Sequence, residues 1–289
     1  MCYRVSRTIH CYLDEDLEGP LSTLYLLKRP LDRISLLEDG SSLFTALNFT
    51  GQNIIVNGKV FHVADLKFFV ESILKELRHS LIHDLLFGII GLVDLDLWSP
   101  GIVHEEPRNT KAGYSCFLDP HNSFLNTQDL LLRTVLDHPQ VSGWFHFLDQ
   151  QGNIVWKASP CLAYLEQCEA LEMLFFTGAH TTVGEPPRGT EAAVQSIRNI
   201  LGGNICNVFI IFQYFCFMGS FNKSVAYQGS KIMRVPHPDL GRLWSFYIAH
   251  VRPLVAIWQA YFHGHAAFLR AENNLFFGLH RSVTLLQLS

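Results

Sequence analysis

The sequence predicts a mainly α-helical protein with a small antiparallel β-hairpin or sheet in its C-terminal half. Two observations indicate this fold class. Apolar residues recur at three- and four-residue steps over most of the chain, and this period gives way to apolar and aromatic runs between Ile205 and Val235. Because 48% of the 289 residues are hydrophobic and only 17% are charged, the chain can bury a sizeable core, as one large domain or two ordinary ones.

The first predicted elements are a short hairpin and a long helix. The first sixty residues are expected to be irregular, apart from a hairpin over residues 54–60 around Asn57-Gly58. A helix is predicted over residues 63–87, because apolar side chains there share one helical face. These side chains are Leu66, Phe69, Val70, Ile73, Leu74, Leu77, Leu81 and Leu85. Residues 98–124 are expected to form a loop, since Pro, Gly and Asn interrupt every period.

Two helices are predicted in the middle of the chain. The first covers residues 127–136 and should end before Pro139. The second has a predicted boundary at each end. Ser159 is placed as its N-cap, Pro160 at its first helical position, and Gly178 just beyond its last turn.

The C-terminal third is expected to combine helices with the strands. Helices are predicted at residues 188–200, 238–251 and 253–270, the last two being separated at Pro253. Strands are predicted at residues 205–218 and 231–235, joined by a polar turn. These elements suggest three parts, namely an irregular segment 1–60, a helical N-terminal domain 61–158 and a core 159–289.

Composition also predicts where the protein works. The N-terminus lacks a signal-peptide pattern, and the longest apolar stretch, Val208 to Met218, is shorter than the roughly 20 residues of a membrane-spanning helix. The seven cysteines include no Cys-x-x-Cys pair, which favours a reducing compartment, and Cys161 and Cys168 are expected to pack in the core. We therefore expect an intracellular protein without a membrane partner.

Charge is distributed unevenly along the chain. Residues 1–187 carry 13 Lys and Arg against 23 Asp and Glu, a net charge of −10. Residues 188–289 carry 9 against 3, a net charge of +6. A basic C-terminal third suggests an anionic partner for that part, although nine dispersed cations can also form an ordinary solvated surface.

Five residues near the predicted strands could contact a nucleic-acid backbone. Arg188 begins a predicted helix with Glu191 three residues later, Lys223 lies in the predicted turn, and Lys231 and Arg234 lie on the second strand. A guanidinium offers two parallel donors to phosphate oxygens, and a turn lysine could act as a general acid beside a leaving oxygen. The alternative interpretation is an Arg–Glu pair that stabilises one helical turn.

A longer pattern surrounds these residues. The chain contains HEEPRNTKAGYSCFLDPHNSFLN, then VW, TTVGEPPRGTEAAVQSIRN, FNKS, KIMRVP and HVRPL in this order. This succession resembles the region that precedes the motor in fungal RecQ-like, telomere-linked helicases, over about residues 54–253. The resemblance implies a degenerate, truncated tyrosine-recombinase-like core over residues 159–289, a nuclear location and double-stranded DNA as a partner.

The resemblance assigns roles to the same five residues. Arg188 and Glu191 match the first recombinase box, Lys223 matches the β-turn lysine, and Lys231 and Arg234 match basic positions of the second strand. This chain also departs from the pattern. No histidine is followed by arginine three residues later, and the chain reaches its last residue before the expected nucleophilic tyrosine. An active site needs its nucleophile, phosphate clamp and acid together, so no catalytic residue is assigned.

Two tyrosines and the absence of a nucleotide-binding motif bear on catalysis. Tyr247 and Tyr261 fall within helical periods and are expected to be packing residues. No G-x-x-x-x-G-K-[ST] motif occurs, so we expect neither a nucleotide nor another cofactor. The sequence thus favours a catalytically inactive DNA-binding or accessory module. The alternative is a truncated mobile-element-derived product with no independent biochemical activity.

Two groups of histidines have both a functional and a structural interpretation. His79 and His83 lie four residues apart beside Asp84, which suggests a two-ligand metal clip and, as a third hypothesis, a metal-dependent hydrolase. Surface histidines are the favoured interpretation, so no metal site is assigned. His263 and His265 flank a glycine in the last helix, where a kink is favoured over a nucleic-acid contact.

An aromatic run could offer a stacking surface for bases. Its members are Phe209, Phe212, Tyr214, Phe215 and Phe217. Buried strand positions are the favoured interpretation, because the core of a central hairpin requires such residues.

Overall fold

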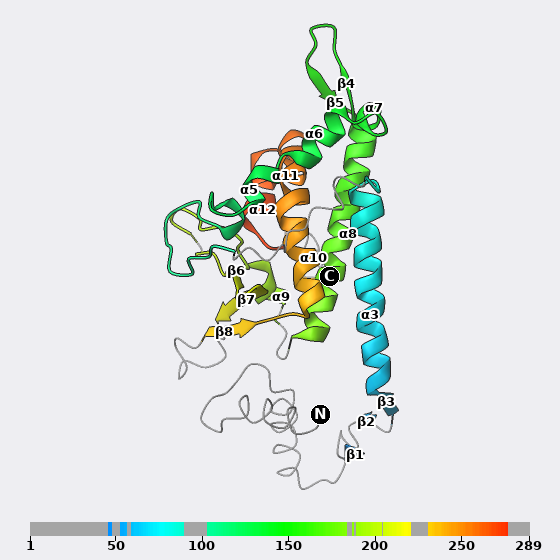
Figure 1. Ribbon diagram of the computed structural model, residues 1–289, viewed down its shortest axis with the longest axis vertical. Helices are drawn as coiled ribbons and strands as arrows, with labels where there is room; N and C mark the ends of the chain where they lie inside the picture. The colour runs from blue at the N-terminus through cyan, green and yellow to red at the C-terminus, as the bar shows by residue number, and fades with distance from the viewer. Residues whose placement is uncertain are drawn as a thin grey trace, which may run out of the picture.

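The molecule is mainly helical and carries small antiparallel sheets (Figure 1). The computed structural model describes residues 46–47, 53–56, 59–89, 103–183, 187, 189–203, 205–220 and 231–276. The predicted fold class, mainly α with a small antiparallel sheet, is confirmed at this level. Among the described residues, no helix combines the length and apolar character needed to cross a membrane.

Long helices form the body of the molecule. Helix α3 (Val63–His79) continues into a π-helical segment η1 (Ser80–Leu85), and α8 (Ala158–Thr182) packs beside it in the opposite direction (Figure 1). A second helical unit packs on this pair and lines the centre of the view in Figure 1. It consists of α10 (Pro238–Phe246), the π-helical segment η4 (Tyr247–Val251), α11 (Arg252–His263) and α12 (His265–Asn273).

The predicted first helix is confirmed, and its apolar face is buried over only part of its length. Ile73, Leu77, Leu81 and Leu85 are buried in the core. Leu66, one helical turn or more before them, is half exposed. Figure 1 shows the reason, because α3 extends past the C-terminal end of α8.

Helix α8 differs from its prediction at both ends. It begins at Ala158, with Lys157 as its N-cap, and it continues through Gly178 to Thr182, so the predicted caps are wrong. Gly178 instead permits close packing between helices, since an added Cβ atom would lie 2.9 Å from Cδ2 of Leu240 on α10. Because Gly178 has no side chain, α8 and α10 can pack closely at this position, and Gly178 does not end the helix.

Pro253 does not separate two helices, contrary to the prediction. The chain passes from η4 directly into α11, and the Arg252 amide donates to the Tyr247 carbonyl five residues earlier. A proline ring crowds the carbonyl four residues before it, and a π-helical turn relieves that contact without ending the helix. The predicted kink between His263 and His265 is confirmed, because Gly264 separates α11 from α12 with a φ of 82°.

Short elements connect the long helices. They are η2 (Cys116–Leu118), α5 (Phe124–Thr127), α6 (Leu130–Asp137), α7 (Ser142–Phe145), β4 (His146–Leu148) and β5 (Ile154–Trp156). Helix α6 confirms the predicted helix before Pro139. Strands β4 and β5 form an antiparallel hairpin that projects at the top of Figure 1 and was not predicted.

The C-terminal sheet has the antiparallel order β6-β7-β8. Its strands are β6 (Val208–Ile211), β7 (Tyr214–Ser220) and β8 (Lys231–Arg234). The single strand predicted over residues 205–218 is therefore a hairpin. Its two turn residues, Phe212 and Gln213, have φ values of 50° and 67°, which is the backbone of a two-residue primed turn despite the absence of glycine.

Two further predictions concern segments that are only partly described. Helix α9 (Gly189–Ala193) is much shorter than the predicted helix over residues 188–200. Near the N-terminus, β1 (Ala46–Leu47), β2 (Asn53–Val56) and β3 (Lys59–His62) form an antiparallel sheet. Val56 pairs with Lys59, which confirms the predicted hairpin.

One hydrophobic core runs through the described chain. It contains Leu77 from α3, Phe175 from α8 and Trp244 from α10, so the boundary predicted at residues 158 and 159 does not separate two cores. The Trp244 ring stacks on Phe175 at 5.2 Å and on Phe215 of β7 at 5.0 Å between ring centroids. These contacts fix the C-terminal sheet against the helical body.

Individual core predictions have mixed outcomes. Cys161, Cys168 and Tyr247 are fully buried, as predicted. Tyr261 is half exposed, so its predicted packing role is wrong. It lies four residues after Ile257, which is also exposed, so both side chains belong to the outward face of α11. In the aromatic run Phe209, Phe215 and Phe217 are buried, whereas the turn residue Phe212 is 91% exposed and its neighbour Tyr214 is half exposed.

Candidate functional site

The five predicted DNA-contacting residues fall into two groups. Arg188 and Lys223 lie outside the described residues. Lys231 begins β8 opposite Ser220, and its side chain is likewise not described. Only Glu191 and Arg234 have described side chains.

Arg234 is buried, which corrects the prediction that it lines an exposed basic surface. It is 3% exposed, and its Nη2 donates to Oε2 of Glu191 at 3.1 Å. Gly219 on the paired strand β7 makes room for the guanidinium, because any Cβ atom there would collide with it. A buried guanidinium requires a compensating charge, and Glu191 supplies one. The pair thereby joins α9 to β8.

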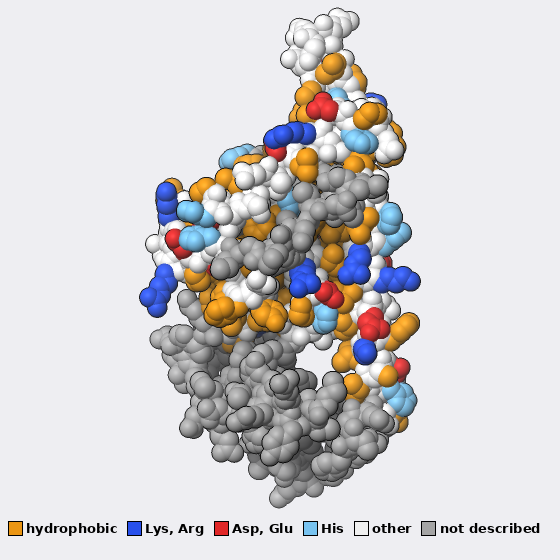
Figure 2. Space-filling view, viewed as in Figure 1, with side chains coloured by type: hydrophobic (Ala, Val, Ile, Leu, Met, Phe, Trp, Pro, Cys, Tyr) orange, Lys and Arg blue, Asp and Glu red, His pale blue; other side chains and the backbone are white. Residues whose placement is uncertain are grey.

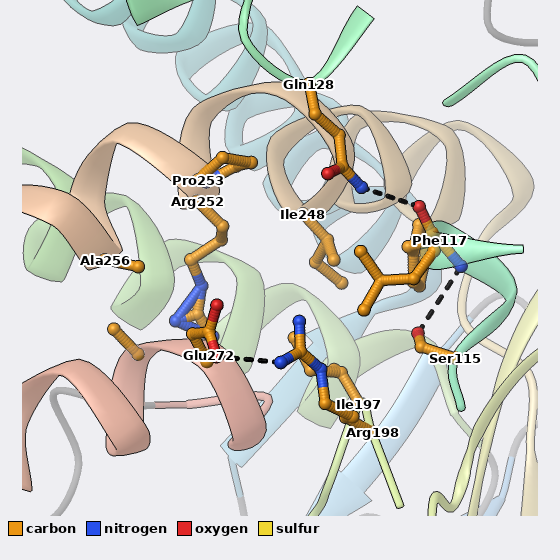
Figure 3. A pocket seen from close by; sticks show the side chains of 12 residues that line it. Ser115, Phe117, Gln128, Ile197, Arg198, Ile248, Arg252, Pro253, Ala256 and Glu272 are labelled. Atoms are coloured by element: carbon orange, nitrogen blue, oxygen red, sulfur yellow. Dashed lines mark hydrogen bonds and ion pairs between the residues drawn. The ribbon is translucent and has the colours of Figure 1, made fainter. Parts of the chain in front are cut away.

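Two further arginines of the basic third are also paired with carboxylates, one pair in the interior and one pair partly buried. Arg252 lies 3.0 Å from Oε1 of Glu172, and both residues are buried. Arg198 donates to Glu272 at 2.7 Å beside a pocket of about 80 Å³ (Figure 3).

Among the described side chains on the face shown in Figure 2, Lys and Arg form no continuous basic band. Figure 2 shows the described Lys and Arg side chains dispersed over this face and interspersed with apolar and acidic ones. Part of the positive charge of the C-terminal third therefore serves internal pairing. A surface for phosphates would have to use the remaining cations.

The best-defined polar cluster lies elsewhere, in the loop before α5. It consists of His104, Asp119 and His121, and we call it the loop cluster. Nδ1 of His104 lies 2.8 Å from Oδ2 of Asp119, and Nδ1 of His121 lies 2.7 Å from Oδ1. The two imidazole rings are 4.7 Å apart between centroids. One carboxylate thus binds two imidazoles through separate oxygens.

Burial within the loop cluster is graded. Asp119 is 6% exposed, whereas the side chains of His104 and His121 are 40% and 70% exposed. The amide of His121 also donates to Asp119 at 2.9 Å. The hydrogen bond to Asp119 raises the pKa of His104 above its ordinary value, because the carboxylate stabilises the imidazolium. The cluster is therefore a buried anion capped by two solvent-accessible rings.

Asn122 fixes the two chain segments of the loop cluster. Its Oδ1 accepts from the His104 amide at 2.7 Å, and its Nδ2 donates to the carbonyls of His104 and Cys116 at 2.8 Å each. All three bonds are to backbone groups, so they hold the position of the chain and not merely of side chains. The ring of His104 is placed over Asp119 as a result.

The residue after His104 connects the same loop to the C-terminal sheet. Glu105 accepts from the Ile210 amide of β6 at 3.0 Å and from the Tyr114 hydroxyl at 3.2 Å. Burial raises the pKa of the Glu105 carboxyl, which opposes its ionisation. Glu105 consequently anchors the loop cluster to the C-terminal sheet.

The predicted histidine pair on the first helix is close but incomplete. The rings of His79 and His83 lie 4.6 Å apart between centroids. A metal site needs at least three ligand atoms close together. Among the described residues, the loop cluster is the group of three such side chains whose ligand atoms all lie within 4.8 Å of one another. His79, His83 and Asp84 do not form such a group.

Sequence reasoning missed the loop cluster. Its residues belong to the segment that was predicted to be an irregular loop, and fourteen residues separate His104 from Asp119. A loop has no period that would place two such positions together. The local sequence Asp119-Pro-His121-Asn122 did contain one signal, since an Asp that accepts from the amide two residues later is a common turn.

Comparison with protein-family models, with curated proteins and with solved structures found no match in any of the three. The resemblance to the region preceding the motor in fungal RecQ-like helicases stays a prediction from the sequence.

Proposed function

We propose that this protein is a DNA-binding accessory module that does not cleave strands, built on a degenerate tyrosine-recombinase-like core. The observation that carries the proposal is the ion pair between Glu191 and Arg234, which joins α9 to β8. Arg188 immediately precedes α9, and Lys223 belongs to the connection between β7 and β8. Arg188 thus precedes one of the two elements that the ion pair joins, and Lys223 lies in the connection that leads to the other.

This proposal changes the roles of two residues. Arg234 positions α9 on the sheet and does not contact phosphate, because it is buried. Glu191 is its partner in that task. Arg188, Lys223 and Lys231 remain as the phosphate-contacting side chains, with double-stranded DNA as the partner and the nucleus as the location implied by the resemblance. Neither a nucleotide nor a cofactor has a part in this function.

Salt-dependent binding to duplex DNA tests the proposal. A labelled duplex of about 20 base pairs is titrated with the full chain at about 50 and 200 mM salt, because displaced counterions make phosphate binding weaken steeply with salt. Replacing one phosphate-contacting cation should lower the salt slope by about one unit. We expect this for Arg188→Ala and Lys223→Ala.

Arg133→Ala is the matched control, since Arg133 is an exposed arginine on α6 in the acidic part of the chain. It should bind DNA as the unchanged protein does. Binding that ignores salt, or an Arg188→Ala variant that binds with unchanged affinity, would contradict the proposal. Nicking of a supercoiled plasmid by the purified chain would contradict the absence of strand cleavage.

The alternative of a truncated mobile-element-derived product makes a different prediction. Such a chain should expose hydrophobic elements that lack partners, and it should aggregate. The continuous core from α3 to Phe276 supports a chain that folds by itself. A cooperative thermal unfolding transition of the purified protein would agree with the accessory module, and aggregation without a transition would favour the alternative.

A further inference from the structure

The loop cluster has the composition of a transition-metal site. Two imidazole nitrogens and one carboxylate oxygen converge within 4.8 Å of one another. Imidazole and carboxylate are typical zinc ligands, whereas Mg²⁺ and Ca²⁺ prefer sets made of oxygen alone. We propose that His104, Asp119 and His121 bind one zinc ion.

The distances fit this proposal with small adjustments. Zinc bonds of 2.0 to 2.2 Å in a tetrahedral site place ligand atoms about 3.4 Å apart. The two nitrogen–oxygen distances in the loop cluster are 2.8 and 2.7 Å, and they run to different oxygens of Asp119. One ligand atom from each of the three residues lies within 4.8 Å of the other two. The ligand atoms would therefore have to shift by no more than about 1.4 Å relative to one another, which a rotation of the exposed rings can provide.

The loop cluster is also held in place before any ion arrives. Asn122 fixes the backbone at His104 and at Cys116, and Asp119 is buried beneath the rings. The rings themselves face solvent, so an ion can reach them without opening the fold. A site whose ligands are already positioned loses little conformational entropy on binding.

A water molecule would be the fourth ligand, because Glu106 lies at the other nitrogen of the His104 ring. Oε1 of Glu106 lies 3.7 Å from Nε2 of His104, whereas Nδ1 faces Asp119. With zinc on Nδ1, the hydrogen on Nε2 would face Glu106, and a carboxylate in that place orients a zinc-bound imidazole. The carboxylates of Asp119 and Glu106 together would balance the charge of a divalent cation.

Proton positions change when zinc binds. A carboxylate only accepts hydrogen bonds, so in the present arrangement Nδ1 of each ring carries the hydrogen that it donates to Asp119. Coordination requires an unprotonated nitrogen, and the neutral imidazole meets this by carrying its hydrogen on Nε2 instead. No net proton is released by a neutral ring.

Zinc titration of the full chain tests the proposal. The protein is stripped with a chelator, dialysed and titrated with zinc chloride against a chromogenic zinc indicator. We expect one equivalent to bind. His121→Ala removes one exposed ring and should leave the fold intact. Loss of a ligand should weaken zinc binding by more than about 100-fold, which is the largest loss usually seen when only a residue that orients a ligand is replaced. Asp119→Asn should weaken it as well.

The double variant His79→Ala/His83→Ala is the matched control. It removes two adjacent imidazoles on the first helix, 4.6 Å apart between ring centroids, and should bind zinc as the unchanged chain does. Zinc should also raise the melting temperature of the unchanged chain and of this control, but not of His121→Ala.

Three results would overturn the proposal: no stoichiometric zinc in the unchanged chain, equal affinity in His121→Ala, or loss of zinc only in the control variant. In each case the contacts of Asp119 would serve to close the loop and nothing more. The titration contains no DNA, so its outcome is independent of the proposed DNA binding.

Discussion

Two ion pairs between an arginine and a carboxylate differ greatly in burial. Arg252 and Glu172 link α11 to α8 in the interior, at 3% and 2% side-chain exposure. Arg133 and Asp129 pair on the surface of α6, where both side chains are at least half exposed. Water compensates the surface charges but cannot reach the interior ones. The comparison teaches that burial, more than the pairing itself, decides how much each arginine contributes to folding.

The interior pair belongs to a closed network. The Tyr247 hydroxyl donates to Oε1 of Glu172 at 3.2 Å, and Arg252 donates to the Leu275 carbonyl at 2.8 Å. The guanidinium also lies 5.6 Å from the centroid of the Tyr247 ring. Three segments that are distant in the sequence are joined by this network, namely α8, the η4–α11 helix and the strand-like segment after α12.

The largest expected effect comes from breaking this network. Arg252→Met leaves the Glu172 carboxylate buried without its cation, and we expect the free energy of unfolding to fall by about 3–5 kcal/mol. Denaturant unfolding measures the change. The double variant Glu172→Met/Arg252→Met removes both charges and should lose less than Arg252→Met alone. Equal losses in the two variants would show that packing, and not the uncompensated charge, sets the cost.

The second prediction extends the comparison to a buried histidine. His250 on η4 is 1% exposed, packs on the Phe246 ring and donates from Nδ1 to the Thr127 carbonyl at 3.3 Å. Burial lowers its pKa from 6.5 to about 4. The unfolded chain therefore takes up a proton at a higher pH than the native state does, and stability falls as the pH drops through this interval.

Between about pH 7 and pH 4 this single group should remove about 3 kcal/mol of stability. His250→Gln cannot gain that proton. Its free energy of unfolding should therefore decline less over the same interval, and the difference between the two pH profiles isolates the histidine from the acidic groups. Parallel profiles would show that His250 binds its proton equally well in the native and unfolded states.

The third prediction concerns an ion pair of intermediate burial. Arg234 is buried, but the Glu191 side chain is 18% exposed. Glu191→Ala should lower the free energy of unfolding by about 2 kcal/mol, the typical value of a hydrogen bond to a charged group. If the proposed function is correct, the same variant should also weaken duplex binding, because α9 would no longer be fixed to the sheet. Unchanged stability would show that water replaces the carboxylate.

The sequence predicted those parts of the fold that follow from local patterns. The period of α3, the Asn57-Gly58 hairpin and the kink at Gly264 each depend on residues within a few positions of one another. Gly178 shows where such reasoning fails. A glycine near a helix end indicates a cap by sequence statistics, yet this one is determined by the approach of Leu240, sixty-two residues further on in the chain.

The proposed site residues follow the same division. The basic positions Arg188 to Arg234 were found from sequence, but whether an arginine faces outward depends on its neighbours. Gly219 and Glu191 turn Arg234 inward, and neither effect has a local pattern. The loop cluster was not predicted at all, because a single asparagine, Asn122, brings His104 to Asp119 across an irregular segment.

The smallest effect is expected at the surface pair. Arg133→Ala removes an exposed guanidinium whose carboxylate partner, Asp129, stays hydrated and lies beside the N-terminus of α6. The helix dipole stabilises that carboxylate even without its cation. We therefore expect a loss of no more than about 0.5 kcal/mol in denaturant unfolding, abolished by high salt. A loss as large as that of Glu191→Ala would mean that burial does not determine the order of the stability losses among the three ion pairs. Local helix geometry would then contribute as much as burial.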